Sequence, residues 1–147
     1  MEQIYPYVQI VHLICAIIFL GYIFFDVVIF MRLKSTLGAD FERVKKAIGS
    51  HAIKIMPVCL FTLIITGGMM MSRWVGSANG GYFGTPLQKI FMLKVTLALI
   101  IAVCVAINLS CRAMGRPAPE FLRANIHKIA FVFGFIIVLC AKLMFVV

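Results

Sequence analysis

The chain has 147 residues, of which 63% are hydrophobic and 13% charged, and its mean hydropathy is +1.08. This composition excludes an ordinary water-soluble domain, and the length fits a single domain over residues 1–147. The formal net charge of +9 does not indicate nucleic-acid binding, because most basic residues lie in short connections between apolar runs.

Four apolar runs follow one another along the chain, each close to the roughly 20 residues that one bilayer crossing needs. They cover residues 8–31, 51–71, 87–110 and 127–147. Backbone in lipid must satisfy its own hydrogen bonds, so we expect all four runs to be helices. The first run lacks the basic start and the cleavage site of a signal peptide, and we expect it to be retained. The predicted fold class is therefore all-α, an integral membrane four-helix bundle.

Basic residues are unevenly shared between the connections, and this sets the expected orientation. Six of the 14 lysines and arginines lie between the first and second runs or in the first turn of the second, four between the third and fourth or in the first turn of the fourth, and only two between the second and third or in the first turn of the third. Short cytoplasmic loops carry such an excess. We therefore expect both termini on the outer, periplasmic side of a bacterial inner membrane, with membrane lipid as the surrounding partner.

The connections differ in character. In the first, "RLKSTLGADFERVKKAIGS", an apolar stripe of Phe41, Val44 and Ile48 predicts a short amphipathic helix on the membrane surface, capped by Asp40. The second, "SRWVGSANGGYFGTPLQ", predicts a loop that ends at Pro86, a usual helix start. The third, "CRAMGRPAPEFLRAN", contains two prolines and predicts a tight turn.

Three ionisable side chains interrupt the apolar runs in the expected outer half: His12, Lys94 and Lys142. Such residues are costly within a membrane and mark functional sites by default. At 1.5 Å per residue, Lys94 lies about 10 Å and Lys142 about 8 Å below the outer edge. The one carboxylate within a run, Asp26, belongs to the inner half, so the two lysines have no protein counter-ion at their level.

A tetrapyrrole suits this combination of groups. A haem b offers carboxylates to Lys94 and Lys142, and its iron accepts a neutral imidazole, for which His12 is the candidate. Tyr22 shares a face of the first run with His12 and would line the ring. Met70, in a methionine triplet at the end of the second run, is the candidate for the opposite axial bond. The competing interpretation is that both lysines extend to the outer head groups and hold no ligand.

A second group of polar residues lies at the inner ends of the runs. His51 and His127 begin the second and fourth runs at a common depth. They are either ligands to a second iron or interfacial side chains that contact water and head groups. Asp26 lies near the level of Lys54 and Arg32, which predicts an ion pair inside the bundle.

Three segments resemble the HemJ-type and CopD-like families of four-helix membrane proteins: "HLICAIIFLG", "LKVTLALI" and "RANIHK…IIVLCAK". The HemJ-type resemblance implies a haem b bound through His12, a lysine needed for activity at Lys94, and further family positions at Arg123 and Lys142. It also implies oxidation of protoporphyrinogen IX to protoporphyrin IX, with electrons passed to a quinone or another respiratory-chain partner. The segment "FFDVVIFMRL" lacks the proline and the terminal histidine of the family pattern.

These observations predict a haem b-binding redox protein of the inner membrane, with His12 and Lys94 as its catalytic residues if it is an enzyme. The CopD-like resemblance keeps a copper-handling protein open, since imidazole and thioether ligands suit Cu(I). A cofactor-free partner subunit is the third interpretation, in which the polar residues only pack helices. The sequence leaves the oligomeric state open, a homo-oligomer included.

Overall fold

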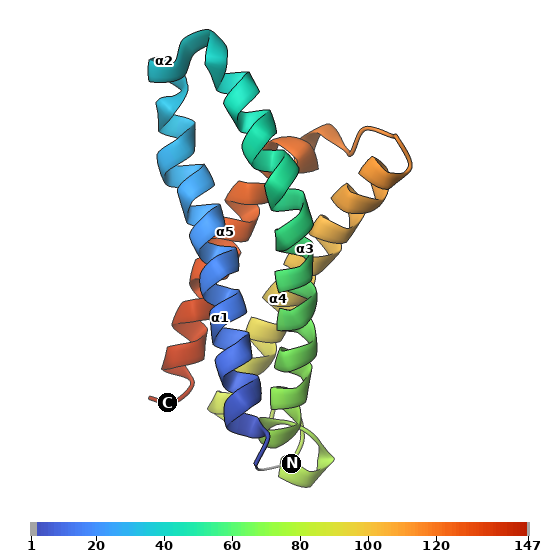
Figure 1. Cartoon of the computed structure of the whole chain (residues 1–147). Helices are drawn as coiled ribbons and strands as arrows, with labels where there is room; N and C mark the ends of the chain where they lie inside the picture. Colours follow the sequence, from blue (N-terminus) through green and yellow to red (C-terminus); the bar gives the residue numbers. More distant parts are fainter. Residues whose placement is uncertain (1–2, 147) are drawn as a thin grey trace.

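The chain is helical almost throughout. The computed structural model describes residues 3–146, and no strand occurs within this range (Figure 1). The long helices are α1 (Tyr5–Phe24), α3 (Phe41–Trp74), α4 (Pro86–Ala113) and α5 (Glu120–Leu143). The expected all-α fold class is confirmed.

Three helical stretches in the described range are long and apolar enough to cross a membrane: Tyr5–Trp74, Pro86–Ala113 and Glu120–Leu143. Roughly 20 apolar residues in a helix match the thickness of the hydrocarbon core. Stretches of this length and composition indicate a multi-pass membrane protein.

The first stretch folds back on itself. A π-helical turn, η1 (Phe25–Ile29), and a 3-10 turn, η2 (Phe30–Leu33), extend α1 toward α2 (Lys34–Leu37). The chain reverses at Gly38, whose φ of +50° is a conformation that glycine adopts without strain. After η3 (Gly38–Asp40), α3 runs beside α1 in the opposite direction (Figure 1).

The long helices pack as two hairpins, because α1 packs mainly against α3 and α4 mainly against α5. The hairpins share a core to which every long helix contributes. Its buried members are Phe19, Ile23, Cys59, Ile101 and Ala130. A second cluster lies where α1 begins and α5 ends, and its buried members are Val75, Phe91 and Met144. We call this end of the molecule the terminal end and the opposite end, which holds α2, the α2 end.

The start of α3 corrects one expectation. The helix begins at Phe41, so the amphipathic segment expected on the membrane surface forms the first turns of α3 instead. Phe41 is buried and stacks on Phe30, with the ring centroids 4.9 Å apart, and this contact holds the start of α3 against η2. Asp40 does not cap the helix, because its backbone is helical and its carboxylate pairs with Arg43 at 3.2 Å. A capping residue needs an extended backbone.

The start of α4 at Pro86 agrees with the sequence, and a capping box fixes it. The Gln88 N–H donates to Oγ1 of Thr85 at 3.2 Å, and the Gln88 side chain accepts from the Thr85 N–H at 3.3 Å. Gln88 is 3% exposed, and its Nε2 donates to the carbonyl of Asn79 at 2.8 Å. One buried amide therefore holds both the helix start and the glycine-rich connection before it.

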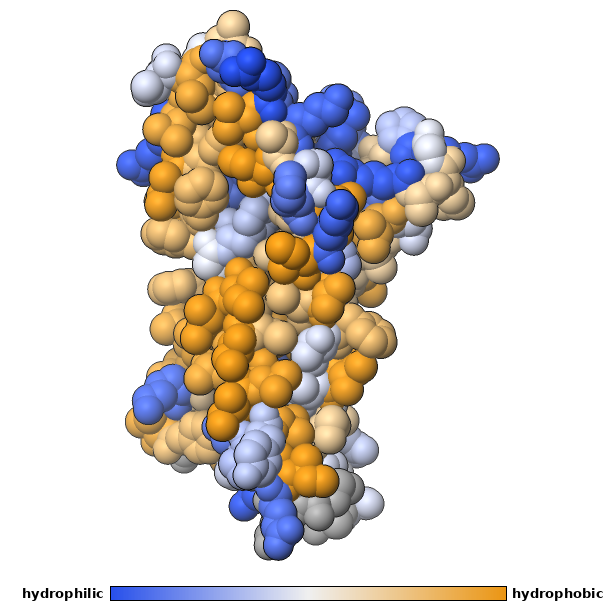
Figure 2. Space-filling view, in the orientation of Figure 1, coloured by the Kyte–Doolittle hydropathy of each residue, from blue (hydrophilic) through white to orange (hydrophobic). Residues whose placement is uncertain are grey.

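The outside of the bundle is largely apolar. The face drawn in Figure 2 has a hydrophobic band across its middle and hydrophilic residues toward its ends, most densely at the α2 end. Each long helix turns large apolar side chains outward; examples with more than half of their surface exposed are Ile17, Phe61, Val103 and Phe135. An apolar surface this extensive is stable against lipid and not against water.

Gly134 allows α5 to approach α1 closely. A Cβ at this position would collide with the side chain of Leu20, whereas a Cβ at Gly21 would meet open space. We expect Gly134→Ile to lower the free energy of unfolding by about 1–3 kcal/mol, the usual cost of overpacking. Gly21→Ala should leave it unchanged or raise it by up to about 1 kcal/mol. Thermal unfolding in detergent measures both, and equal effects at the two positions would contradict this packing.

Candidate functional site

His12 is half-buried on α1 and contacts α3. Its Nδ1 lies 2.7 Å from Oγ1 of Thr66, and Thr66 is 7% exposed. The ring also packs over bare backbone at Gly67, where an added Cβ would lie 3.4 Å from Cε1 of the imidazole. A polar contact and a close packing contact with α3 thus fix the orientation of the ring.

The Thr66 hydroxyl determines which nitrogen of His12 carries the proton. Oγ1 of Thr66 donates its single hydrogen to the carbonyl of Thr62 at 2.6 Å, so toward His12 the oxygen is an acceptor. Nδ1 is then the protonated nitrogen, and Nε2 keeps its lone pair. Metal-binding histidines in proteins show the same arrangement, because the bond to one ring nitrogen orients the other toward the metal.

Lys94 extends from α4 and is half-buried. Its Nζ lies 4.8 Å from the centre of the Phe91 ring. The ammonium is within electrostatic reach of His12 on α1 and of Cys140 on α5. Within residues 3–146 no carboxylate pairs with Lys94. Lys94 and His12 thus interact through their charges, and no hydrogen bond joins them within the described residues.

The other residues expected around the haem have no described contact with His12. Lys142 is exposed in the last turn of α5, and Met70 is partly buried near the end of α3. Tyr22 lies farther along α1, where its ring meets that of His127 edge-on at a centroid distance of 6.0 Å. In the described part of the chain none of these three shares a hydrogen bond or a ring contact with His12.

A second polar pair joins α1 to α5 toward the α2 end. Nδ1 of His127 is hydrogen-bonded to Oδ2 of Asp26, whose side chain is 13% exposed. Asp26 lies in the π-helical turn η1, a type of turn that occurs often at functional sites. Asp26 does have a partner inside the bundle, but it is hydrogen-bonded to His127 and does not form the expected ion pair with Lys54 or Arg32, whose side chains are exposed.

The other polar residues expected at this end remain separate from the pair. His51 is exposed, and its Nδ1 lies 3.1 Å from the carbonyl oxygen of Ala47 on its own helix. Arg123 is exposed as well. The described contacts of His51 and His127 do not bring them together as ligands of one metal. Within residues 3–146 no group of three or more histidine, cysteine, aspartate or glutamate side chains is placed to hold a metal ion.

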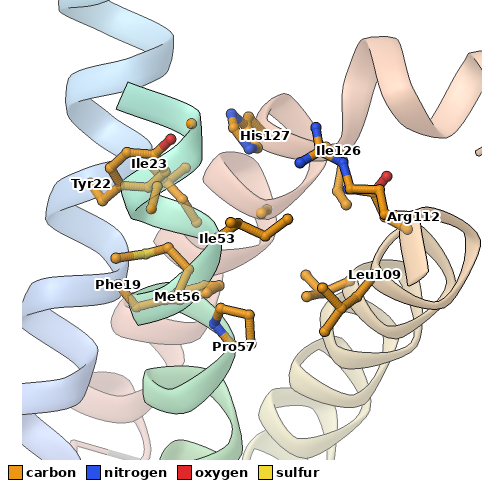
Figure 3. Close-up of a pocket in the computed structure, with 15 residues that line it drawn as sticks. Phe19, Tyr22, Ile23, Ile53, Met56, Pro57, Leu109, Arg112, Ile126 and His127 are labelled. Carbon is orange, nitrogen blue, oxygen red and sulfur yellow. The ribbon is translucent and has the colours of Figure 1, made fainter. Parts of the chain in front are cut away.

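A cavity of about 150 Å³ lies beside His127, with walls from α1, α3, α4 and α5. In Figure 3, Tyr22, His127 and Arg112 lie along one edge of this cavity. The opposite part is apolar and is formed by Phe19, Met56, Pro57 and Leu109. The cavity thus combines an apolar interior with a polar edge at the α2 end.

Comparisons with known proteins identify no family for this chain. No family model matches it, and no curated protein or solved structure shows significant similarity to it. The HemJ-type and CopD-like resemblance therefore remains a hypothesis based on short motifs.

Two features of the site were not predicted from the sequence: the role of Thr66 and the inner cavity. In an antiparallel hairpin, the position numbers of two facing residues add up to the same total along the whole hairpin. His12 and Thr66 have the same total as Phe19 and Cys59, which meet in the core. If the first and second apolar runs are taken as a hairpin, this rule predicts from the sequence that Thr66 faces His12. The cavity left no such signal, because its walls come from four segments far apart in the chain.

Thr66→Val keeps the shape of the side chain and removes the acceptor for Nδ1 of His12. We expect it to lower the free energy of unfolding by about 1–3 kcal/mol, the usual cost of an unpaired buried polar group. Thr62→Val is the matched control, because the Thr62 hydroxyl bonds the Val58 carbonyl of its own helix at 2.9 Å. Nitrogen NMR of labelled histidine reports the tautomer, and a His12 protonated on Nε2 in the unsubstituted protein would contradict the assignment.

Proposed function

We propose that this chain is a bacterial inner-membrane protein that crosses the bilayer four times and binds a b-type haem through His12. The first helical stretch reverses at Gly38, so α1 and α3 count as separate crossings. Basic residues gather in the two connections at the α2 end, which favours a cytoplasmic position for that end and a periplasmic position for both termini.

The hydrogen bond between His12 and Thr66 is the observation that carries the haem proposal. It holds a half-buried imidazole in the tautomer whose Nε2 has a lone pair. A neutral imidazole of this kind is a usual axial ligand of haem iron. Gly67 offers backbone and no side chain next to the ring, so the imidazole is held without a bulky neighbour on α3.

Lys94 supplies the positive charge that a haem propionate requires. Its ammonium is half-buried among apolar side chains, without a carboxylate partner in the range 3–146. A charge in the membrane interior is costly when it lacks a counter-ion, and a ligand carboxylate removes that cost. Lys142 is exposed, and its position favours contact with lipid head groups.

One-electron redox chemistry is what a haem b supplies when bound. The chain's own residues hold and orient the group: His12 provides the ligand nitrogen, Thr66 fixes its tautomer, and Lys94 holds a carboxylate. The shared core of the hairpins excludes water from the level below the site. With the HemJ-type motifs, the proposal extends to oxidation of protoporphyrinogen IX, with electrons passed to the respiratory chain.

Purified protein should show the Soret band and the reduced α-band of a b-type haem in its visible spectrum. His12→Ala should remove most of the haem, because the iron loses its ligand from the chain. Thr66→Val should lower haem retention, because the ring is no longer held in one tautomer. His51→Ala is the matched control at an exposed histidine and should keep the haem.

Other spectra would point to the other interpretations. Colourless protein with stoichiometric copper would favour a copper-handling protein, and colourless, metal-free protein would favour a partner subunit. Haem that is lost from His127→Ala protein but retained in His12→Ala protein would place the site at the α2 end.

Lys94→Met tests the counter-ion role, since methionine is similar in length and carries no charge. Removing one partner of a buried ion pair costs about 3–5 kcal/mol, so haem retention should fall sharply, and Lys94→Arg should be intermediate. Lys89→Met, at an exposed lysine in the first turn of the same helix, is the control and should retain haem. Haem per protein and thermal stability are the measurements. A fully loaded, more stable Lys94→Met protein would refute the counter-ion role.

A further inference from the structure

The cavity at the α2 end lies outside the proposed haem site. Its volume is about 150 Å³, and an apolar cavity of this size holds a single six-membered ring. Phe19, Met56 and Pro57 form part of its apolar wall (Figure 3). Leu109 and Arg112 on α4 are exposed and mark the side on which the cavity opens. The space therefore suits a flat, apolar ring with a substituent that leaves the bundle.

His127 gives this cavity a hydrogen-bond acceptor. The Asp26 carboxylate accepts a hydrogen bond from Nδ1 of His127, so the proton of the neutral ring is held on Nδ1. The lone pair is then on Nε2. Because the imidazole lines the cavity, Nε2 is the ring nitrogen that accepts a hydrogen bond from a ligand hydroxyl.

α3 contains a second acceptor among the residues that line the cavity. Pro57 lies inside α3 and has no N–H, so the carbonyl of Ile53, one turn earlier, lacks its usual helix donor. Ile53 and Pro57 both line the cavity. A carbonyl without a donor is costly in a membrane, and a ligand hydroxyl removes that cost.

A neutral ligand fits the cavity better than an anion does. The Asp26 carboxylate lies directly behind His127 and disfavours a second negative charge nearby. Arg112, the cation of the cavity wall, is exposed at the opening. The two acceptors suit a ring that carries hydroxyl donors, in a lining that also holds the Tyr22 hydroxyl and the Asn108 amide.

We propose that this cavity binds the ring of a lipid-soluble 1,4-benzoquinol. One hydroxyl donates to Nε2 of His127, the other donates to the Ile53 carbonyl, and the apolar tail leaves past Leu109 into the bilayer. The inference goes beyond the haem proposal and does not depend on it, because the cavity lies toward the α2 end and His12 toward the terminal end of the bundle.

Anaerobic calorimetric titration of the full-length protein in nonionic detergent tests the proposal, with a 1,4-benzoquinol that carries one isoprene unit as the probe. We expect saturable one-to-one binding. The oxidised quinone has no hydroxyl to donate and should bind about ten-fold or more weakly. Met56→Trp fills the apolar part of the cavity and should abolish binding. His127→Gln should weaken binding about ten-fold or more, for the same reason as the quinone.

Two control variants separate this site from its surroundings. His51→Gln, at an exposed histidine of α3, should bind the quinol like the unsubstituted protein. His12→Ala should bind it normally even without haem, so failure of the haem proposal and failure of this one give different results. Thermal unfolding shows that each variant is folded, and Met56→Trp carries the test alone if His127→Gln is not.

Three outcomes overturn the proposal. The first is no saturable binding of the quinol by folded, unsubstituted protein. The second is unchanged binding by Met56→Trp protein. The third is tighter binding of laurate than of the quinol, lost in Arg112→Gln, which would make the cavity a site for a carboxylate.

Discussion

Polar groups within hydrocarbon have no water to bond, and this constraint accounts for the main polar contacts inside the molecule. Hydroxyl groups on α3 bond carbonyls of their own helix, as Thr62 does with Val58. Imidazoles and carboxylates cannot be satisfied in that way and need a second helix. The pair of His12 with Thr66 fixes α1 against α3, and the pair of Asp26 with His127 fixes α1 against α5. Polar satisfaction therefore specifies which helices are neighbours, while the apolar surfaces supply close packing.

The first helix carries both polar pairs, at different levels. His12 and Asp26 lie about 20 Å apart along the helix axis, at a rise of 1.5 Å per residue. Between them, Phe19 and Ile23 belong to the core that both hairpins share. These two side chains also line the cavity at the α2 end, so the core forms its wall on the side toward His12. The bundle thus has two polar pairs at different levels of α1, each with its own histidine, and the shared apolar core lies between them.

Sequence patterns predicted the features that a single helix determines by itself. Apolar run length identified the helices, and the isolated charges drew attention to His12 and Lys94. Relations between helices were harder to predict. Asp26 was paired by depth with basic side chains, but packing places η1 against α5 and so selects His127. Tyr22 lies on the same face of α1 as His12, but a shared face does not mean a shared depth in the bundle, and Tyr22 contacts His127 instead. The apolar stripe at Phe41 is the same whether a helix lies on a membrane or continues into it, and the aromatic stack on Phe30 decides between them.

Because α3 is long, the α1–α3 hairpin extends farther at the α2 end than the α4–α5 hairpin does (Figure 1). The 34 residues of α3 make a helix of about 50 Å, whereas the hydrocarbon core of a bilayer is about 30 Å thick. α3 is therefore longer than one crossing of the hydrocarbon core requires. The reversal at Gly38, with Arg43 in the first turn of α3, forms the tip of this hairpin at the α2 end. The turn between α4 and α5 does not extend as far in this direction (Figure 1).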